Sequence, residues 1–301
     1  MAKVRICRAV ESNVGERRAY KKQLVKLQRD FNTFVLNEIF LALESQNALT
    51  VDSKLSPDDR QKEILKALKG KTLKGKATAL FEWIYDFVGR NLKRWLDLLA
   101  DASRGVVDRF VKKAMASTSN AQKAALKAAG VKPSIFTDRW TVSVVGKQTV
   151  SPEAARLMPD FIKQNVSLIT KIGESDVSRI ADTLIKGLEE GMDYNKLRSE
   201  LMATSGFDGA RADRVALDQI NKINQQVQIL NAQSLGCTHA RWKHVPGQYT
   251  SRRSHMKMDG REFNLAEGMY DETVGYNVIP GQLPYCRCVS RLLIPNEVLN
   301  D

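Results

Sequence analysis

The sequence lacks the features of membrane and secreted proteins. No segment of its 301 residues reaches the ~18 uninterrupted apolar positions of a membrane-spanning helix. The first seven residues, Met1–Cys7, carry basic side chains but not the apolar stretch of a signal peptide. The chain has only four cysteines, and Cys7 stands far in sequence from the others, so no disulfide framework is indicated. We therefore expect a protein that starts in a reducing cytoplasm and has no membrane partner.

Familiar catalytic motifs are missing as well. The chain has no Walker A loop, no Gly-x-Gly-x-x-Gly turn and no His-Glu-x-x-His helix. The zinc deaminase pattern requires His-x-Glu and Pro-Cys-x-x-Cys, whereas this chain has the different cysteine spacing Pro284-Tyr285-Cys286-Arg287-Cys288. These absences predict a protein that is not an enzyme.

The sequence does contain enough apolar residues for a folded core. Its composition, 43% hydrophobic and 27% charged, is that of a globular protein, and its length allows two or three domains. Apolar residues recur at three- and four-residue spacing, which predicts helices, through much of the first 235 positions. We predict a mainly α fold, with helical N-terminal and middle regions and a small α+β, loop-rich C-terminal module. The predicted segments are a basic helical domain at 1–135, a helical linker and core domain at 136–235, and the Cys/His-containing module at 236–301.

Cap and turn residues predict where the elements begin and end. We expect helices over 15–46, from Pro57, from an N-cap at Ser175 to a stop at Gly191, from an N-cap at Asp193, and over 208–236. Short strands are predicted at 141–145, 148–150, 239–245, 261–263 and 291–294. The helix over 208–236 is rich in amides outside its apolar seam. Such amides support an assembly surface or hold the end loops, but we expect most of them to form a solvent face.

The positive charge is confined to one half of the chain. Residues 1–150 hold 29 Lys/Arg against 15 Asp/Glu, a net of +14, while residues 151–301 hold 18 against 19, a net of −1. A basic half suggests a polyanionic partner, and double-stranded DNA is the obvious one. The densest positive stretch is the best candidate for phosphate contact: Lys66, Lys69, Lys71, Lys74 and Lys76. A solvated lysine face that aids solubility explains the same residues equally well.

Chemistry-bearing side chains concentrate near the C-terminus. All three histidines and three of the four cysteines lie between Cys237 and Cys288. Imidazole and thiolate are the side chains that bind zinc, so one interpretation is a tetrahedral zinc site. Its ligands would be His255, Cys286 and Cys288, with His244 or Asp259 as the fourth.

A second interpretation of the same residues needs no metal. Free cysteine is among the most buried residue types, so Cys286 and Cys288 would be small buried hydrophobic residues and His255 a hydrogen-bonded structural residue. A disulfide between Cys286 and Cys288 is disfavoured, because one intervening residue makes a strained ring.

The C-terminal segment also resembles a known family. The resemblance rests on Trp242, Arg253-x-His255, Met258-Asp259-Gly260 and Pro284-x-Cys286-Arg287-Cys288. It continues upstream through residues 161–172, Gly187-Leu188-x-x-Gly191, Arg211-Ala212, Ala216-Leu217-Asp218-Gln219 and Lys222-x-Asn224. In order and spacing, these residues, which lie between about 155 and 295, resemble the phage head morphogenesis family of Mu F-like minor head proteins. Two departures are Pro246-Gly247-Gln248-Tyr249, where the family often has an acid, and Leu217, where it has an arginine.

The resemblance implies a function for the whole chain. It implies a phage minor head protein, associated with the portal and the procapsid interior, whose partners are the portal protein, the major capsid or scaffold proteins and the packaged DNA. Its location would be the virion, and the host cytoplasm during assembly. It also assigns structural roles to Trp242, Asp259 and Gly260, and makes Asp218 and Gln219 anchors toward the C-terminal segment. The alternative is a metal-dependent nucleic-acid-processing enzyme carried in the virion.

Overall fold

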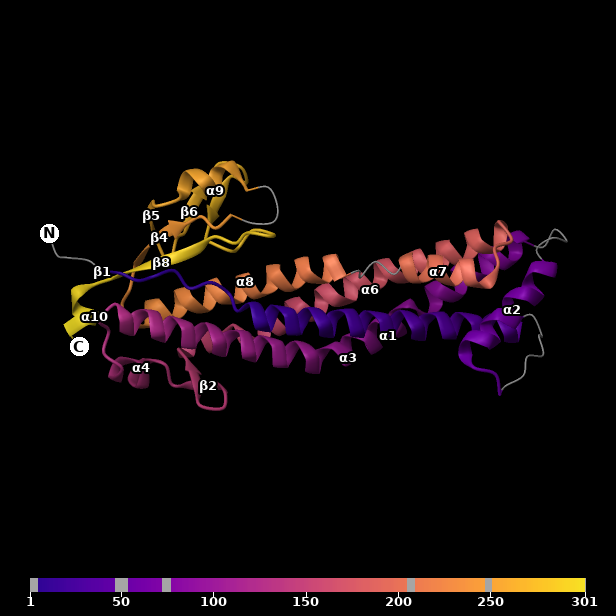
Figure 1. Ribbon diagram of the computed structural model, residues 1–301, viewed down its shortest axis with the longest axis horizontal. Helices are drawn as coiled ribbons and strands as arrows, with labels where there is room; N and C mark the ends of the chain where they lie inside the picture. The colour runs from indigo at the N-terminus through magenta and orange to yellow at the C-terminus, as the bar shows by residue number, and fades with distance from the viewer. Residues whose placement is uncertain (1–4, 47–53, 72–76, 205–208, 247–250, 301) are drawn as a thin grey trace. The chain divides into compact units, whose positions relative to one another are not determined.

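A computed structural model of the protein describes all residues except 1–4, 47–53, 72–76, 205–208, 247–250 and 301. Most of the described chain is helical, with short strands gathered mainly near its C-terminal end, which confirms the predicted fold class (Figure 1). The helices are α1 Val14–Gln46, α2 Pro57–Lys71, α3 Ala77–Ala128, α4 Ser134–Arg139, α5 Pro152–Arg156, α6 Met158–Glu189, α7 Tyr194–Thr204, α8 Gly209–Ser234, α9 Arg253–Met258 and α10 Asn296–Asn300. The strands are β1 Arg5–Ile6, β2 Val142–Val145, β3 Gln148–Val150, β4 His239–Lys243, β5 Glu262–Asn264, β6 Met269–Asp271, β7 Tyr276–Val278 and β8 Val289–Ile294.

The described chain groups into two compact units that interleave in sequence. The first unit contains residues 1–21, 106–165 and 213–301, and the second contains residues 22–105 and 166–212. The long helices α1, α3, α6 and α8 each supply residues to both units. The segment limits near 135 and 235 expected from the sequence do not coincide with the limits of these units.

The second unit is built from helices packed through apolar faces. On α1, the side chains of Leu24, Phe31, Val35 and Ile39 are buried, with Val35 and Ile39 fully so, and α3 contributes Ile84, Trp95 and Leu99. Gly173 of α6 allows a close approach, because a Cβ there would lie 2.4 Å from a methyl carbon of Leu99. At the end of α1, Glu44 accepts two hydrogen bonds from the Arg60 guanidinium of α2, at 2.9 and 3.1 Å.

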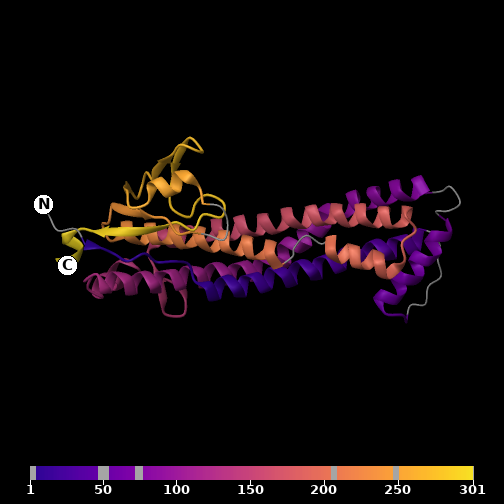
Figure 2. The ribbon, with the colours of Figure 1, turned by 45° about the horizontal axis from the view of Figure 1, so that its top comes forward.

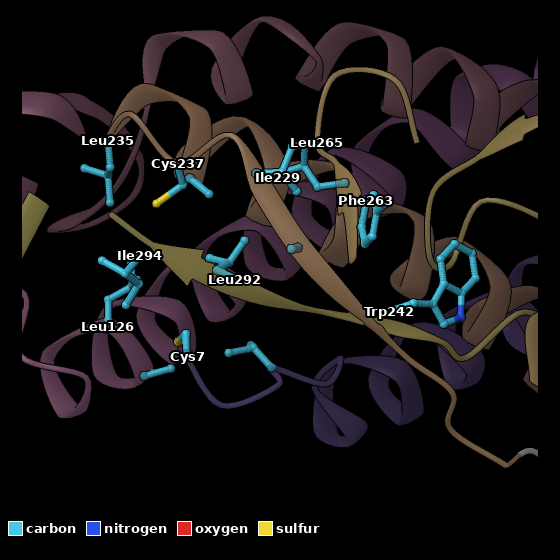
Figure 3. Close-up of a cluster of buried hydrophobic side chains, with 14 of the residues drawn as sticks. Cys7, Leu126, Ile229, Leu235, Cys237, Trp242, Phe263, Leu265, Leu292 and Ile294 are labelled. Carbon is cyan, nitrogen blue, oxygen red and sulfur yellow. The ribbon is translucent and has the colours of Figure 1, made fainter. Parts of the chain in front are cut away.

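The first unit holds a four-stranded sheet in the order β1-β8-β4-β5, with every neighbouring pair antiparallel. In the central pair, Trp242 of β4 lies opposite Ser290 of β8. Both views of the ribbon show β8 running alongside α8 (Figures 1 and 2). The apolar side of this sheet packs on α8, α3 and α4 in one cluster of buried side chains, to which Trp140 belongs. Figure 3 shows other members of this cluster, including Cys7, Leu126, Ile229, Cys237, Trp242, Phe263, Leu292 and Ile294.

Helix α8 presents a row of buried amides to the rest of the first unit. Asn224 donates to the carbonyl of Val10 at 3.0 Å, and Asn231 accepts from the backbone N–H of Ser151 at 2.9 Å. Asn231 also donates to Gln122 Oε1 of α3 at 3.1 Å. The expectation of a solvent face is therefore wrong for most of the amides, which are buried: Gln219, Asn221, Asn224, Gln225, Gln228 and Asn231. The physical reason is that irregular segments pack on this face and their backbone groups need partners there.

Most predicted helices and strands are present. The helix over 15–46 is α1, the helix from Pro57 is α2, and the hairpin and the C-terminal strands lie at β2, β3, β4, β5 and β8. Asp193 caps α7 by accepting from the N–H of Lys196 at 3.0 Å. The predicted helix start at Ser175 is wrong, because α6 runs unbroken from Met158 to Glu189. The predicted start of α8 at residue 208 lies outside the described residues.

Candidate metal centre

Two separate segments of the chain bring the candidate ligands together. His255 lies on the short helix α9, and Cys286 and Cys288 lie on the loop that leads into β8. The ligand atoms of these three residues lie within 4.8 Å of one another, and all three side chains are buried. The structure therefore assembles the three ligands predicted from the sequence, although they are separated by about thirty positions of the chain.

The individual distances are short. His255 Nδ1 lies 3.3 Å from Cys286 Sγ and 3.7 Å from Cys288 Sγ. His244, just after β4, places its Nδ1 3.5 Å from Cys288 Sγ. All four side chains line one cavity of about 210 Å³, together with Arg252 and Tyr285.

A buried carboxylate holds the other side of His255. His255 Nε2 lies 3.0 Å from Asp271 Oδ2, and both side chains are almost completely buried, with relative exposures of 3% and 0%. The other oxygen of Asp271 accepts from the backbone N–H of Thr273 at 2.9 Å. Burial raises the pKa of Asp271, but the hydrogen bonds from Thr273 and Ser254 and the neighbouring His255 outweigh it, so the pKa lies below the usual value. The carboxylate therefore stays ionised and fixes the orientation of the ring.

Cys286 and Cys288, which with His255 form the His/Cys cluster, differ from the two other cysteines in the pKa of their thiols. Burial raises the pKa of Cys7 to about 11 and that of Cys237 to about 12, as expected for cysteines that act as small hydrophobic residues. The pKa of Cys286 is instead lowered, mainly by the hydrogen bond with Cys288, and His255 lowers it further against the effect of burial. The pKa of Cys288 is raised by the same hydrogen bond and by burial. The pair thus favours a thiolate on Cys286 with a proton retained on Cys288.

Trp242 packs against one side of the His/Cys cluster. Trp242 is fully buried, and its ring meets that of His255 edge-on at a centroid distance of 5.1 Å. Its indole N–H meets no acceptor with good geometry among the described residues, yet it lies close enough to Cys288 to lower the pKa of that thiol. A thiolate on Cys288 would give this N–H a charged acceptor.

Asp259 and Gly260 shape the backbone next to the cluster. Asp259 Oδ1 accepts from the backbone N–H of His244 at 2.8 Å, and its other oxygen accepts from Lys243 Nζ at 3.3 Å. Gly260 has a φ of +77° and donates its N–H to the carbonyl of Trp242 at 2.8 Å. Among the described residues, the ligand atoms that lie within 4.8 Å of one another are those of His255, Cys286 and Cys288, and Asp259 is outside this group.

Helix α8 holds the cysteine loop in place. Asp218 accepts from the backbone N–H of Tyr285 at 2.9 Å, and Asn221 donates to the carbonyl of Cys286 at 3.1 Å. Gln219 donates to Asp218 at 3.1 Å, and so supports this anchor indirectly. Tyr285 has a φ of +61°, a conformation that non-glycine residues rarely adopt. Asp218 therefore contacts the C-terminal segment directly and Gln219 supports Asp218, and their role as anchors stays a prediction.

The predicted DNA-contact lysines are only partly described. Lys66 is exposed on α2, and its Nζ lies 4.0 Å from Glu63 Oε2. The side chains of Lys69 and Lys71 and all of Lys74 and Lys76 lie outside what the structure describes. Phosphate contact by these five residues therefore stays a prediction.

Sequence reasoning missed Asp271. The residue follows a short stretch, Met269-Tyr270, that carries no strong strand signal, and Asp271-x-Thr273 by itself indicates only a turn. Its partner, His255, was found because histidine is rare in this chain, whereas Asp271 is one of 34 acidic residues. Only the β6–β7 hairpin brings the carboxylate to the imidazole.

Comparison with known proteins agrees with the resemblance read from the sequence. Residues 178–291 match the family described as phage Mu protein F like protein. No curated protein and no solved structure matches the chain. The matched region contains α7, α8, β4 and all the cluster residues, including Asp271.

The resemblance to the phage head morphogenesis family is therefore confirmed over this region, and the family indicates a head morphogenesis protein located in the virion. Across the part of the chain that the structure describes, every helix is too short or too polar to cross a membrane.

Proposed function

We propose that this chain is a phage minor head protein that associates with the portal and the procapsid interior and contributes structure instead of catalysis. The observation that carries the proposal is the match of residues 178–291 to the phage Mu F-like family. The matched region contains the buried polar anchors of α8 and the His/Cys cluster, so the family likeness coincides with a built structural module.

The test is incorporation into heads. The gene is deleted from its phage and supplied in trans, and purified procapsids and mature heads are analysed by quantitative mass spectrometry and by electron cryomicroscopy. The proposal predicts a few copies per head, density at the portal vertex and heads that fail to mature without the protein. Complete absence of the protein from procapsids and heads would overturn it.

We infer that the basic first half of the chain contacts double-stranded DNA inside the head. Its net charge of +14, from 29 basic and 15 acidic residues, supports this proposal, and Lys66 stands exposed on α2. Each phosphate neutralised by a lysine contributes about 0.9 to the slope of log K against log salt concentration. Changing Lys66, Lys69, Lys71, Lys74 and Lys76 to Gln in the full chain should therefore reduce both the affinity for a DNA duplex and the salt slope.

The matched control for DNA binding uses exposed lysines outside the basic half. Lys163, Lys171, Lys186 and Lys196 are exposed and belong to the half of the chain with a net charge of −1. Their change to Gln should alter the salt slope less than the change in the basic half does. Equal losses in the two variants would mean that DNA binding, where present, is a nonspecific effect of charge.

We infer further that zinc occupies the cluster of His255, Cys286 and Cys288. Two sulfurs and an imidazole nitrogen are the ligand types that zinc prefers, and they converge here in a buried position. Zinc content of the purified full chain, measured by inductively coupled plasma mass spectrometry, should be close to one ion per chain. A folded protein without metal would contradict zinc binding but not the proposal that the chain is a minor head protein.

A further inference from the structure

The distances within the cluster match the edges of a tetrahedron. With Zn–S of about 2.3 Å and Zn–N of about 2.0–2.1 Å, tetrahedral angles place a sulfur and a nitrogen about 3.6 Å apart. The observed Sγ to Nδ1 distances are 3.3 Å for Cys286 and 3.7 Å for Cys288, both measured to His255. Three corners are therefore present, and one remains to be assigned.

His244 is placed to supply the fourth corner. Its Nδ1 lies 3.5 Å from Cys288 Sγ, which is again close to a tetrahedral edge, and the side chain lines the same cavity. His244 is outside the group whose ligand atoms all lie within 4.8 Å of one another, so a rotation of its side chain has to bring the ring closer to Cys286 and His255. Its backbone is already fixed, because its N–H donates to Asp259 at 2.8 Å.

The fixed backbone also defines the role of Asp259. Both carboxylate oxygens are engaged, one by the N–H of His244 and the other by Lys243 Nζ, and the residue is exposed. A carboxylate held in this way positions His244 and does not act as the fourth ligand.

Asp271 completes the environment on the opposite side. Metal-bound histidines usually donate their second ring N–H to a carboxylate, which fixes the tautomer and orients the ring. The 3.0 Å contact from His255 Nε2 to the buried Asp271 leaves the Nδ1 lone pair facing the two sulfurs. Asp271 is therefore a positioning residue for the metal site, through His255.

We propose that this chain binds one Zn²⁺ in a closed site made of Cys286 Sγ, Cys288 Sγ, His255 Nδ1 and His244 Nδ1, with Asp271 positioning His255. The inference rests on the zinc binding proposed above and deepens it, because a closed set of four protein ligands leaves no open position for water or substrate. The role of the ion is to join the end of β4, helix α9 and the cysteine loop. The cysteine loop is in turn fastened to α8 by Asn221 and Asp218.

The experiment starts with the wild-type protein. X-ray absorption at the zinc edge of the purified full chain should give two sulfur and two nitrogen ligands. The same protein loaded with cobalt should show the strong visible absorption of a four-coordinate ion and a thiolate charge-transfer band. A zinc shell with an oxygen in the fourth position would overturn the closed site, and so would a zinc-free folded protein whose Cys286 thiol reacts freely with iodoacetamide.

Three variants test the separate roles, and His239 offers a matched control. His239 lies on β4, the strand that ends just before His244. Its Nδ1 contacts the hydroxyl of Thr238 at 2.9 Å, and the residue is outside the cluster. H244N should change the cobalt spectrum and weaken zinc affinity, whereas H239N should leave both unchanged. An unchanged spectrum in H244N contradicts the proposal.

The positioning residues give a different signature. D271N should keep the four-ligand cobalt spectrum while zinc affinity falls by about 10–100-fold, as expected for loss of an outer-shell carboxylate. D259N should change neither the ligand count nor the sulfur content of the metal shell. Loss of a ligand from the metal shell in D259N would instead identify Asp259 as a metal ligand. Because the wild-type spectrum counts ligands directly, the proposal stays testable where a variant fails to fold, and head incorporation is measured separately.

Discussion

The two compact units are stabilised in different ways. In the second unit, long helices bury apolar faces, and Ile39, Ile84 and Trp95 are fully buried. In the first unit, the C-terminal strands are three to six residues long, and side chains of α8 bond to backbone groups of the cysteine loop and of β8. The comparison teaches that helical segments need only the right periodicity, whereas a loop-rich module needs a specific partner for each irregular backbone group.

The largest expected effects come from two of the fully buried tryptophans, Trp242 in the first unit and Trp95 in the second. Truncating Trp242 or Trp95 to Ala should each lower the free energy of unfolding by about 3–5 kcal/mol, because a large cavity is left in a packed core. Trp242 packs edge-on against His255, so W242A should also speed the labelling of cysteines in native buffer. W95A should not, since all four cysteines belong to the first unit. Chemical denaturation and thiol labelling measure the two effects. Equal labelling in both variants would contradict the proposed difference between the two units.

The next effect separates buried from less buried amides on α8. Asn231 is fully buried, and N231A leaves the N–H of Ser151 and the side chain of Gln122 without their partner. The expected cost is about 1–3 kcal/mol, the penalty for an unsatisfied buried polar group. Gln226, half-buried on the same helix, is the control, and Q226A should cost far less. Urea denaturation of both variants checks this, and equal costs would show that the buried amides are not specific anchors.

Two glycines in the second unit sharpen the role of helix packing. A Cβ at Gly173 would lie 2.4 Å from Leu99 and 3.2 Å from Phe31, so G173A should destabilise by about 1–3 kcal/mol through overpacking. Gly89 is exposed within α3, and a Cβ there meets nothing within 4 Å. G89A should therefore stabilise the protein by about 0.5–1 kcal/mol, because alanine is the better helix former. Opposite shifts in the melting temperature are expected, and shifts of the same sign would contradict the packing account.

The smallest effect concerns an exposed ion pair near the cluster. Lys257 Nζ lies 2.6 Å from Glu272, but the two side chains are 67% and 62% exposed. E272Q should change the free energy of unfolding by less than about 1 kcal/mol, because surface ion pairs are screened by water and salt. Measured zinc affinity should also stay unchanged in this variant. A larger change in either quantity would mean that surface charge, and not the buried polar contacts, holds the module.

Periodicity predicted the helices well because it depends only on neighbouring residues. The limits of α1 and the start of α2 follow from apolar spacing and from Pro57. Ser175 misled the prediction because serine also occurs on helix surfaces, where no cap is needed. The interleaved units were not foreseeable, since they depend on where helices of 26 to 52 residues meet again in space.

The sequence indicated the candidate ligands His255, Cys286 and Cys288, which the structure brings together, but not the residues around them. Cysteine and histidine are so rare in this chain that their crowding near the C-terminus was informative. Asp271 and the amides of α8 are common residue types, and their role depends on whether they are buried. Burial in turn depends on contacts between residues far apart in sequence, such as that of Asn221 with Cys286. The strands β1, β6 and β7, of two or three residues each, were missed as well.

Hydrogen exchange of the full chain, with zinc bound and after treatment with a chelator, tests most directly the claim that the cluster fastens the C-terminal module. The account predicts that chelation lowers amide protection in 239–244, 253–258 and 284–294 and leaves the helical residues 22–46 and 77–105 unchanged. No change in the module on chelation, or an equal loss throughout the chain, would contradict it.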